Sequence, residues 1–488
     1  MEQTNQGKAN TMTRKKLAGV ALLVGLVFAA GACEPLTDVN NNPNAPTDVP
    51  ARFLLPQSIR VAVEQTFGAG QMLQHTGLWA QHFAQIQYPD EETGQVRPAR
   101  MSGYWNGYYA GPLMDVQTVI DKGVDGAEPN EEGVGRIWKA WIYHIITDLW
   151  GDVPYSEALQ GADNTTPAYD TQQAVYAGLI AELTAAGALL DNADDGFGDG
   201  DLIYGNDFNK WERFANSLRM RLAMRMSEVD PAGAQAAFVA AYNAGGFTSN
   251  ADNAKLDYPG SPYQQPFYEN YLGRDDNSIS GAMVDTLASL NDPRLALYAE
   301  PTTYDGTYRG HYNGYADPDS SLSFYSRIGN FWRANGEATP SMIMTYSEVL
   351  FLEAEAVARG WIAGDAAASY AAAIQANMEQ YDGYGAGISA ADIATYLAQP
   401  AVAYTGINDI HLQKWIALWM NGSEAYANWR RTDVPTLTPG PDLLTTRIPV
   451  RFSYPDEEQS LNQTNMQAAV SRQGGGLDLV TLVWWDIN

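Results

Sequence analysis

Long segments with apolar residues three or four positions apart recur along this sequence of 488 residues. In the clearest one, residues 135–150, Ile137, Trp141 and Leu149 fall on one helical face, and further apolar side chains widen that face. A helix that is apolar around so much of its circumference packs among other helices. The same periodicity predicts helices at residues 53–67, 72–87, 171–191, 209–229, 341–359, 366–381, 390–398 and 407–421.

The spacing of these segments predicts a mostly α fold. Residues 137–154 and 342–361 share a helix–turn–helix pattern that resembles degenerate tetratricopeptide units, without a regular repeat of about 34 residues. Between them the chain becomes rich in Pro, Gly, Asn and Asp, which is typical of long loops with brief helices. We therefore predict a tetratricopeptide-like solenoid core of helical hairpins with an irregular, loop-rich lobe. The predicted single domain, 51–488, comprises a helical core at about 51–249 and 341–435, the lobe at about 250–340 and a C-terminal tail at 436–488, where residues 477–486 form a short strand or a packed tail.

The single cysteine, Cys33, ends a pattern that is typical of export. Basic residues at 14–16 precede an apolar run at 17–28 and small residues at 29–32, which are the three parts of a secretory signal. Small residues before a cysteine are also typical of the lipobox of bacterial lipoproteins, although Ala30 stands where Leu is usual. We predict a signal peptide at 1–32, lipidation of Cys33 and a tether at 33–50. The alternative is an ordinary signal peptide with an incidental cysteine.

A lipid on Cys33 would hold the protein at a membrane surface. No second apolar run of about 20 residues follows, so the sequence predicts a protein that is anchored to a membrane and does not cross it. Met12 is an alternative start, because residues 1–11 add nothing that a signal needs.

The balance of charges limits the possible partners. With 57 acidic against 29 basic residues, the net charge of -28 would repel phosphate backbones and argues against nucleic acid as a partner. Only 18% of residues are charged, whereas 11% are aromatic, including 28 Tyr and 13 Trp. A surface of neutral polar groups and rings suits neutral ligands such as sugars.

Aromatic and polar side chains alternate most densely at residues 304–333. Rings stack on the CH faces of sugars, and Asn, Asp and Arg pair with their hydroxyl groups. The candidate ligand-binding residues in this stretch are Tyr304, Tyr308, Arg309, Tyr312, Tyr325 and Trp332. Trp105 and Asn106 form a second candidate, and polar residues at 74–85, Gln81 among them, are placed to line the same cleft. The alternative for each ring is that it packs the protein interior.

Metal and catalytic motifs are weak. The Asp-rich run at 191–207 suggests calcium, but an EF-hand starting at Asp195 would put Phe197 at its third position and Asn206 where Glu is required. A solvated acidic loop is the favoured interpretation, and we expect no cofactor. No nucleophile elbow, zinc-binding HExxH or phosphate-binding loop is present. Asp152 and Glu348 flank predicted helices, where capping or hydrogen bonding between helices is their expected role.

Five segments resemble the SusD/RagB family, and its SusD-like branch in particular. In chain order they are LTDVNNNPNAPTDVP after the cysteine, ITDLWGDVPYSEAL at 146–159, DLIYGNDFNKWERFANSLRMRLAMRMS at 201–227, MTYSEVLFLEAEAVARGW at 344–361 and QKWIALWMNGSEAYANWRRTDVP at 413–435. Together they are spread over nearly all of the predicted mature chain.

The resemblance implies four tetratricopeptide-like helix pairs that support a variable loop region. It implies an outer-membrane lipoprotein, facing the cell exterior, that binds a nutrient and delivers it to a SusC-like TonB-dependent transporter. The expected ligand is a glycan, or in some members a peptide, and the family binds without cleaving. The alternatives are a secreted glycan-active hydrolase, whose two carboxylates sequence alone does not exclude, and a helical scaffold lipoprotein without a ligand of its own.

Overall fold

Helices form most of the computed structural model, which describes residues 48–95, 97–317 and 322–488. The predicted signal peptide, Cys33 and nearly all of the predicted tether lie outside these ranges. The α-helices are α3 (Ala51–Phe67), α4 (Gly77–Trp79), α5 (Pro98–Tyr108), α6 (Met114–Gly126), α7 (Pro129–Trp150), α8 (Gln172–Gly187), α9 (Phe208–Arg225), α10 (Pro231–Ala244), α11 (Pro266–Gly273), α12 (Gly281–Ser289), α13 (Leu295–Tyr298), α14 (Tyr346–Ala358), α15 (Ala366–Glu379), α16 (Ala390–Leu397), α17 (Ile407–Ala417), α18 (Gly422–Thr432), α19 (Asp456–Leu461) and α20 (Gln463–Gln473). Two π-helical turns, Ala69–Thr76 and Tyr109–Leu113, and four 3₁₀ turns, Gly161–Asp163, Gly198–Gly200, Asn250–Asp252 and Asp382–Tyr384, join them.

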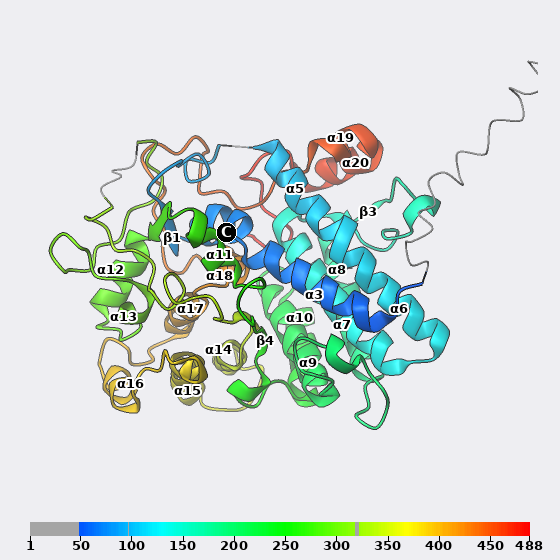
Figure 1. The fold of residues 1–488 in the computed structure, drawn as a ribbon, viewed down its shortest axis with the longest axis horizontal. Helices are drawn as coiled ribbons and strands as arrows, with labels where there is room; N and C mark the ends of the chain where they lie inside the picture. The colour runs from blue at the N-terminus through cyan, green and yellow to red at the C-terminus, as the bar shows by residue number, and fades with distance from the viewer. Residues whose placement is uncertain (1–47, 96, 318–321) are drawn as a thin grey trace, which may run out of the picture. The chain divides into compact units, whose positions relative to one another are not determined.

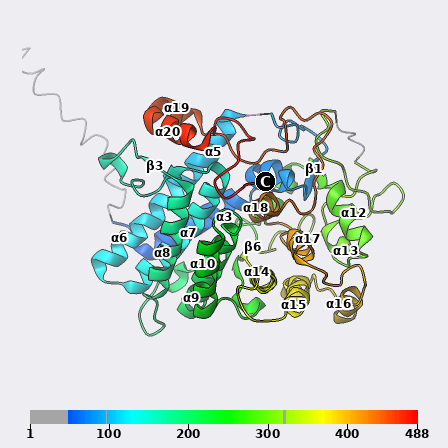
Figure 2. The ribbon, with the colours of Figure 1, turned by 180° about the vertical axis from the view of Figure 1, so that it is seen from behind.

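Consecutive helices pack on one another from α6 to α10, which is the arrangement of a tetratricopeptide-like solenoid. A second group is built on α14, which packs on α15, α17 and α9 and so connects the two groups. In Figures 1 and 2, helices α6–α8 lie at one end of the unit formed by residues 51–488, and α12, α13 and α16 lie at the other. The predicted fold class is confirmed.

Helix α7 shows why the periodic segments become buried helices. Pro129 and two glutamates occupy its first turn. The missing N–H group of Pro costs nothing there, because the N–H groups of the first turn have no partner within the helix. The acidic side chains lie at the positive end of the helix dipole. Trp138, Trp141 and Trp150 are fully buried, and the first two rings stack with centroids 4.4 Å apart. The helix ends at Gly151, whose φ of 81° is accessible to glycine at little cost.

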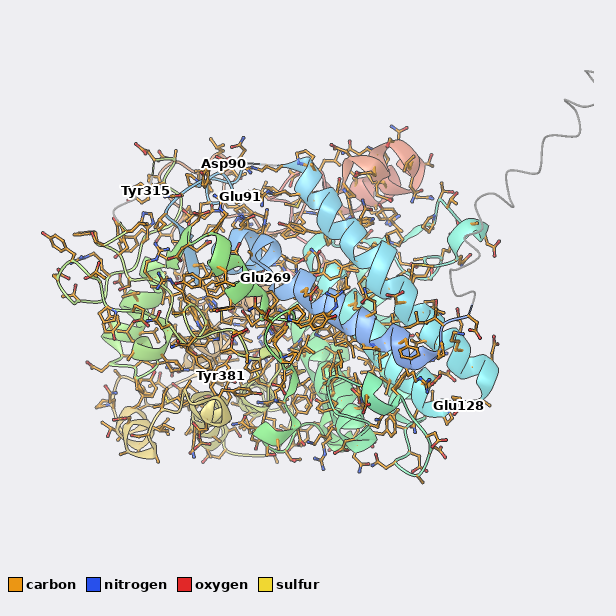
Figure 3. All side chains as sticks on the ribbon, viewed as in Figure 1. Asp90, Glu91, Glu128, Glu269, Tyr315 and Tyr381 are labelled. Atoms are coloured by element: carbon orange, nitrogen blue, oxygen red, sulfur yellow. The ribbon has the colours of Figure 1, made fainter. Side chains whose placement is uncertain are left out.

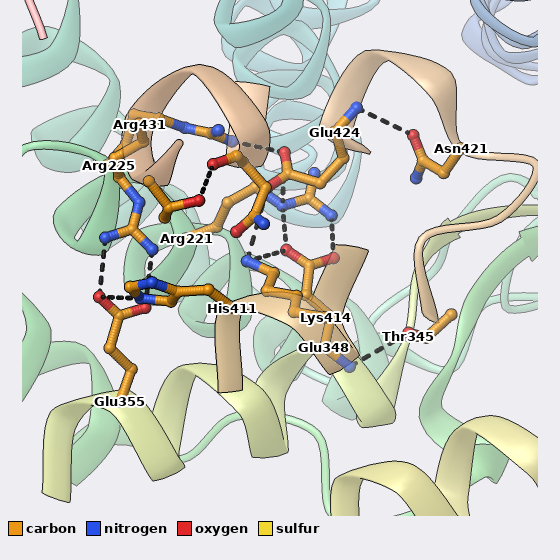
Figure 4. Close-up of polar contacts among 12 residues, drawn as sticks. Arg221, Arg225, Thr345, Glu348, Glu355, His411, Lys414, Asn421, Glu424 and Arg431 are labelled. Atoms are coloured by element: carbon orange, nitrogen blue, oxygen red, sulfur yellow. Dashed lines mark hydrogen bonds and ion pairs between the residues drawn. The ribbon is translucent and has the colours of Figure 1, made fainter. Parts of the chain in front are cut away.

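Charged side chains from α9, α14, α17 and α18 meet inside the helical core (Figure 4). We call this set the ionic core, and its members are Arg221, Arg225, Glu348, Glu355, Lys414, Glu424 and Arg431. Arg221 pairs with Glu348 at 2.6 Å, and Arg431 pairs with Glu355 at 2.7 Å. Glu348 thus bonds between helices as predicted, and so does Asp152, which accepts from the backbone N–H of Gln172 at 2.9 Å.

Three short antiparallel pairs complete the secondary structure. Their strands are β1 (Phe83–Gln85) with β5 (Asn277–Ile279), β2 (Val153–Pro154) with β3 (Tyr169–Asp170), and β4 (Ala254–Leu256) with β6 (Ser341–Met344). In register, Phe83 lies opposite Ile279 and Leu256 opposite Ser341.

Two of these strands correct the predicted helices. The helix predicted at 72–87 ends at Trp79, because the chain reverses at Gln81, with φ of 52°, and enters β1. The helix predicted at 341–359 begins only after Thr345, whose side chain caps α14, because residues 341–344 form β6. All four residues of β6 are buried, so the sequence there does not show the alternation of apolar and polar residues that indicates a strand.

The stretch predicted as loop-rich, 250–340, contains only short elements, among them α11, α12 and α13. The tail is packed: residues 477–486 form neither helix nor strand, and Trp485 is fully buried. Within the part of the chain that the structure describes, no helix combines the length and apolarity that crossing a membrane requires.

Candidate functional site

A surface groove of about 370 Å³ lies between the turn at residues 312–315, the first turns of α12 and the segment 435–441. Its lining residues are Gln81, Ala282, Asp285, Thr286, Tyr312, Asn313, Tyr315, Pro435, Thr436, Leu437, Thr438, Pro439, Gly440 and Pro441. The groove therefore combines tyrosine rings with amide, hydroxyl and carboxylate groups.

Tyr312 is held flat on the start of α12 while much of its side chain stays in solvent. The residue is 57% exposed, and its hydroxyl donates to Asp285 Oδ2 at 2.5 Å, which raises the pKa of Tyr312. Its ring lies against Gly281, where a methyl group would come within 2.5 Å of the ring. The missing side chain at Gly281 thus makes room for one face of Tyr312.

Tyr315 ends a row of aromatic rings that runs along the neighbouring loops. The row contains Tyr304, Phe324, Tyr325, His311 and Tyr315, and successive ring centroids lie 5.6, 5.2, 4.6 and 6.4 Å apart. Tyr315 is 42% exposed and Tyr304 is 68% exposed. The row of rings thus runs through the loops of the lobe and ends at the groove.

Arg309 reinforces this row of rings. Its guanidinium lies 4.0 Å from the Phe324 ring centroid and donates to Asp305 Oδ2 at 2.9 Å. These contacts bring together the predicted residues Tyr304, Arg309 and Tyr325. Tyr312 is the next residue in the sequence after His311 and lies at the groove.

The opposite wall is the segment 435–441, which contains three prolines. Gln81 fixes this wall from below, because its Nε2 donates to the carbonyl oxygen of Thr438 at 2.8 Å. Gly314 and Gly440 bring the two walls into backbone contact, since a methyl group on Gly314 would lie 2.5 Å from the Cα of Gly440. Gly314 also has a φ of 82°, a conformation that favours glycine.

Two predicted site residues belong to the core and are corrected here. Trp332 is fully buried, with ring centroids of Tyr298, Tyr381 and Trp419 within 6.0 Å, and Trp105 is 5% exposed. A ligand has no ring face to reach at either residue.

The remaining two candidates lie apart from the groove lining. Asn106 is exposed on α5, and Tyr308 is partly buried against the core. The stretch 304–333 therefore contains both buried rings, such as Trp332, and exposed rings, such as Tyr312 at the groove.

Sequence reasoning missed Asp285 and the 435–441 wall, and it did not name Tyr315 among the candidate residues, although Tyr315 lies within the aromatic stretch 304–333. The proline-rich run at 435–441 was visible, but nothing in the sequence pairs it with residues 312–315, more than 100 positions earlier. Gln81 lines the groove, but Trp105 and Asn106, with which residues 74–85 were predicted to share a cleft, do not.

Acidic side chains elsewhere stabilise loops. In the Asp-rich run, Asp201 accepts from the indole N–H of Trp211 at 2.7 Å and from the backbone N–H of Asn206 at 2.8 Å. Among the described residues, no group of three or more His, Cys, Asp or Glu side chains is placed to hold a metal ion. That no cofactor is needed stays a prediction.

Comparisons with known proteins agree with this fold. The model of the SusD-like family, described as starch-binding and associating with the outer membrane, matches residues 43–455. The solved structure of a chitin-binding protein is 32% identical, with a TM-score of 0.81 over 90% of this chain and 100% of that one. A chitin-binding SusD homolog from Flavobacterium johnsoniae is 26% identical, with a TM-score of 0.79 over 90% of this chain and 98% of its own.

A SusD homolog from Bacteroides uniformis ATCC 8492 is 25% identical, with a TM-score of 0.79 over 90% of this chain and 99% of its own. None of the curated proteins matches the sequence. Since the family model covers most of the sequence, the chain belongs to the SusD-like family, described as starch-binding and associating with the outer membrane.

Proposed function

We propose that this protein binds a chitin-type oligosaccharide in the groove at Tyr312 and Tyr315. The observation that carries the proposal is the pair of exposed tyrosine rings beside Asp285 in one groove. Aromatic faces bind the CH faces of pyranose rings, and carboxylate, amide and hydroxyl groups pair with sugar hydroxyls.

The class of glycan is taken from the similar structures. Two of them, 32% and 26% identical to this chain, are described as chitin-binding, whereas the family description names starch. Both polysaccharides are neutral chains of pyranose rings, so one groove chemistry suits either, and the two classes have to be separated by experiment.

The groove supports binding without hydrolysis. Glycoside hydrolysis uses two carboxyl groups about 5–10 Å apart on opposite sides of the bond. Among the described residues that line the groove, Asp285 is the one carboxylate, and it accepts a hydrogen bond from Tyr312. This favours a binding protein over the alternative of a secreted hydrolase.

We further propose that a lipid on Cys33 anchors the protein to the outer membrane, facing the exterior, where it passes the glycan to a SusC-like TonB-dependent transporter. The family's association with the outer membrane and the signal-like residues 14–33 support this part. Co-purification of the lipidated protein with such a transporter tests it, and C33S should remove the protein from the membrane fraction.

Titration of the full chain carrying C33S with chitohexaose and with maltohexaose tests the ligand. We expect chitohexaose to bind at one site per chain and neither saccharide to yield new reducing ends. Binding of maltohexaose alone would contradict the chitin assignment. Release of reducing ends, or binding of a peptide library but of neither saccharide, would contradict the function itself.

A further inference from the structure

Glu92 lies beneath the groove and bonds to the turn that carries both tyrosines. The residue is 5% exposed and is absent from the groove lining. Its Oε1 accepts from the backbone N–H of Gln85 at 2.6 Å and from Asn313 Nδ2 at 3.0 Å. Its Oε2 accepts from the backbone N–H of Gly314 at 3.0 Å. One carboxyl group therefore joins the end of β1 to the two residues between Tyr312 and Tyr315.

The residue that follows Glu92 bonds to the chain just beyond the other wall. The backbone N–H of Leu444 donates to the carbonyl oxygen of Thr93 at 2.8 Å, a few residues beyond the segment 435–441. The tyrosine turn bonds to the residue that follows this wall, because the N–H of Asp442 donates to the carbonyl oxygen of Gly314 at 3.1 Å. Figure 3 shows Tyr315 along the same edge of the molecule as Asp90 and Glu91, the residues that lead into Glu92. Residues 92 and 93 thus bond, from one short segment, to the tyrosine turn and to the chain that continues from the segment 435–441.

The contact between the walls leaves little room for adjustment. Gly314 and Gly440 touch through their backbones, so a shift of the turn at 312–315 changes the groove directly. Asn313 supports the same turn, because its Nδ2 also donates to the carbonyl oxygen of Phe83 at 2.8 Å and its Oδ1 accepts from Ser280 Oγ at 2.7 Å. These additional bonds keep the turn attached when Glu92 is changed, so the expected effect is a loosened groove.

We propose that Glu92 is a positioning residue for the groove: without contacting the ligand, it fixes the turn bearing Tyr312 and Tyr315 against the wall at 435–441. This inference rests on the proposed function for its effect on glycan binding. Its structural part, the attachment of the turn, can be measured without any ligand.

The test replaces Glu92 in the full chain carrying C33S. E92L keeps a similar volume and removes both acceptor oxygens, which leaves the N–H groups of Gln85, Asn313 and Gly314 without that partner. We expect its affinity for chitohexaose to fall about tenfold or more. Amide hydrogen exchange should become faster in peptides covering residues 312–316 and 440–444. E92Q keeps one acceptor oxygen, so both readouts should lie between those of wild type and E92L.

The matched control is E91Q in the neighbouring residue. Glu91 is also buried and also bonds to Gln85, whose Nε2 donates to Glu91 Oε2 at 3.1 Å, but its ion pairs are with Arg97 at 3.5 Å and Arg100 at 3.4 Å and not with the tyrosine turn. We expect E91Q to bind chitohexaose like wild type and to leave exchange at 312–316 unchanged. An equal loss of affinity in E91Q would show a general effect of this segment and would overturn the assignment to Glu92.

The outcomes separate the two proposals. Wild-type affinity together with wild-type exchange in E92L overturns the positioning role, as does faster exchange with unchanged affinity. If wild type binds no saccharide, the proposed function fails. In that case faster exchange in E92L still supports the attachment of the tyrosine turn by Glu92, and unchanged exchange refutes that attachment. If E92L does not fold, E92Q decides by the same two measurements.

Discussion

Buried carboxyl groups are stabilised in opposite ways in the helical core and beneath the groove. In the ionic core, burial raises the pKa values of Glu355 and Glu424, but Arg431, Arg225 and other cations outweigh it. The pKa of Glu355 is thus held well below its usual value and that of Glu424 is lowered to about 2. Glu92 has N–H donors but forms no ion pair with any residue that the structure describes, and burial raises its pKa to about 8. The carboxylates of the ionic core are stabilised by pairing with cations, whereas the carboxyl group beneath the groove is held by backbone and amide N–H groups.

The two regions also differ in whether they lie in the segments that resemble the family. All members of the ionic core lie in three of the segments that resemble the family, at 201–227, 344–361 and 413–435. Tyr312, Tyr315 and Asp285 lie in none of them. The resemblance therefore covers the charged side chains of the ionic core, whereas the residues of the proposed ligand groove lie outside the five segments.

The largest expected effect comes from breaking the ionic core. Glu355 is buried with Arg431 at 2.7 Å and Arg359 at 2.9 Å, so E355Q leaves buried guanidinium charge without its counterion. We expect the free energy of unfolding in urea to fall by about 3–5 kcal/mol. Chitohexaose affinity of the folded protein should not change.

The control for this prediction is E64Q. Glu64 pairs with Arg60 on α3 at 2.6 Å, and both side chains are about one third exposed, so its loss should cost about 0.5 kcal/mol or less. If E355Q costs no more than E64Q, the ionic core is not what holds the helices together.

Opposite pKa shifts predict opposite pH dependences. Glu355 and Glu424 ionise more readily in the folded state, so their contribution to stability is complete above about pH 4.5 and is lost as the pH falls through the lowered values. Glu92 binds its proton more tightly when folded, so its contribution is complete below about pH 4.5 and is lost as the pH rises through about 8. For Glu92, the free energy of unfolding falls by at most about 1.4 kcal/mol per pH unit.

Thermal unfolding of wild type and E92Q between pH 5 and 9 measures this difference. Because Gln does not ionise, E92Q should gain stability relative to wild type as the pH rises. A difference that stays constant across this range would show that the buried carboxyl group does not titrate there.

A smaller effect tests the platform beneath Tyr312. In G281A the added methyl group would meet the ring at 2.5 Å, so we expect a loss of about 1 kcal/mol in stability and about fivefold in chitohexaose affinity. G103A is the control, because its methyl group on α5 meets nothing within 4 Å and should stabilise the helix slightly. Equal affinities for the two variants would contradict a role for Gly281 in seating the ring.

The smallest effect is expected at Asn106, which the sequence placed among the ligand-binding candidates. Its side chain is exposed on α5 and is absent from the groove lining. We expect N106A to change stability by less than about 0.5 kcal/mol and to leave chitohexaose affinity unchanged. A clear loss of affinity in N106A would place a binding surface on α5.

Helices with a regular apolar face could be predicted because their signal is local. The strand β6 could not, because its four residues are buried on all sides through pairing with residues about 85 positions earlier. Trp332 stands in a polar, turn-rich stretch, yet Tyr298, Tyr381 and Trp419 from three other segments enclose it. Its burial depends on contacts that no local pattern contains.

The groove shows the same limit. Tyr312 was predicted from its neighbours, since rings and polar groups alternate around it. Asp285 and Glu92 each lie far from residue 312 in the sequence and become part of the site only through hydrogen bonds to Tyr312 and Gly314. Composition predicted the kind of ligand, and the tertiary contacts form the groove that we propose as its binding site.

The most direct test of the account is chitohexaose titration of Y312A and Y315A against Y263A. Tyr263 is a matched control, because it is 58% exposed, compared with 57% for Tyr312, and lines a different pocket beside α3. We predict that Y312A and Y315A each weaken binding about tenfold or more, while Y263A binds like wild type. Wild-type affinity in both groove variants, or an equal loss in Y263A, would contradict the claim that this groove binds the glycan.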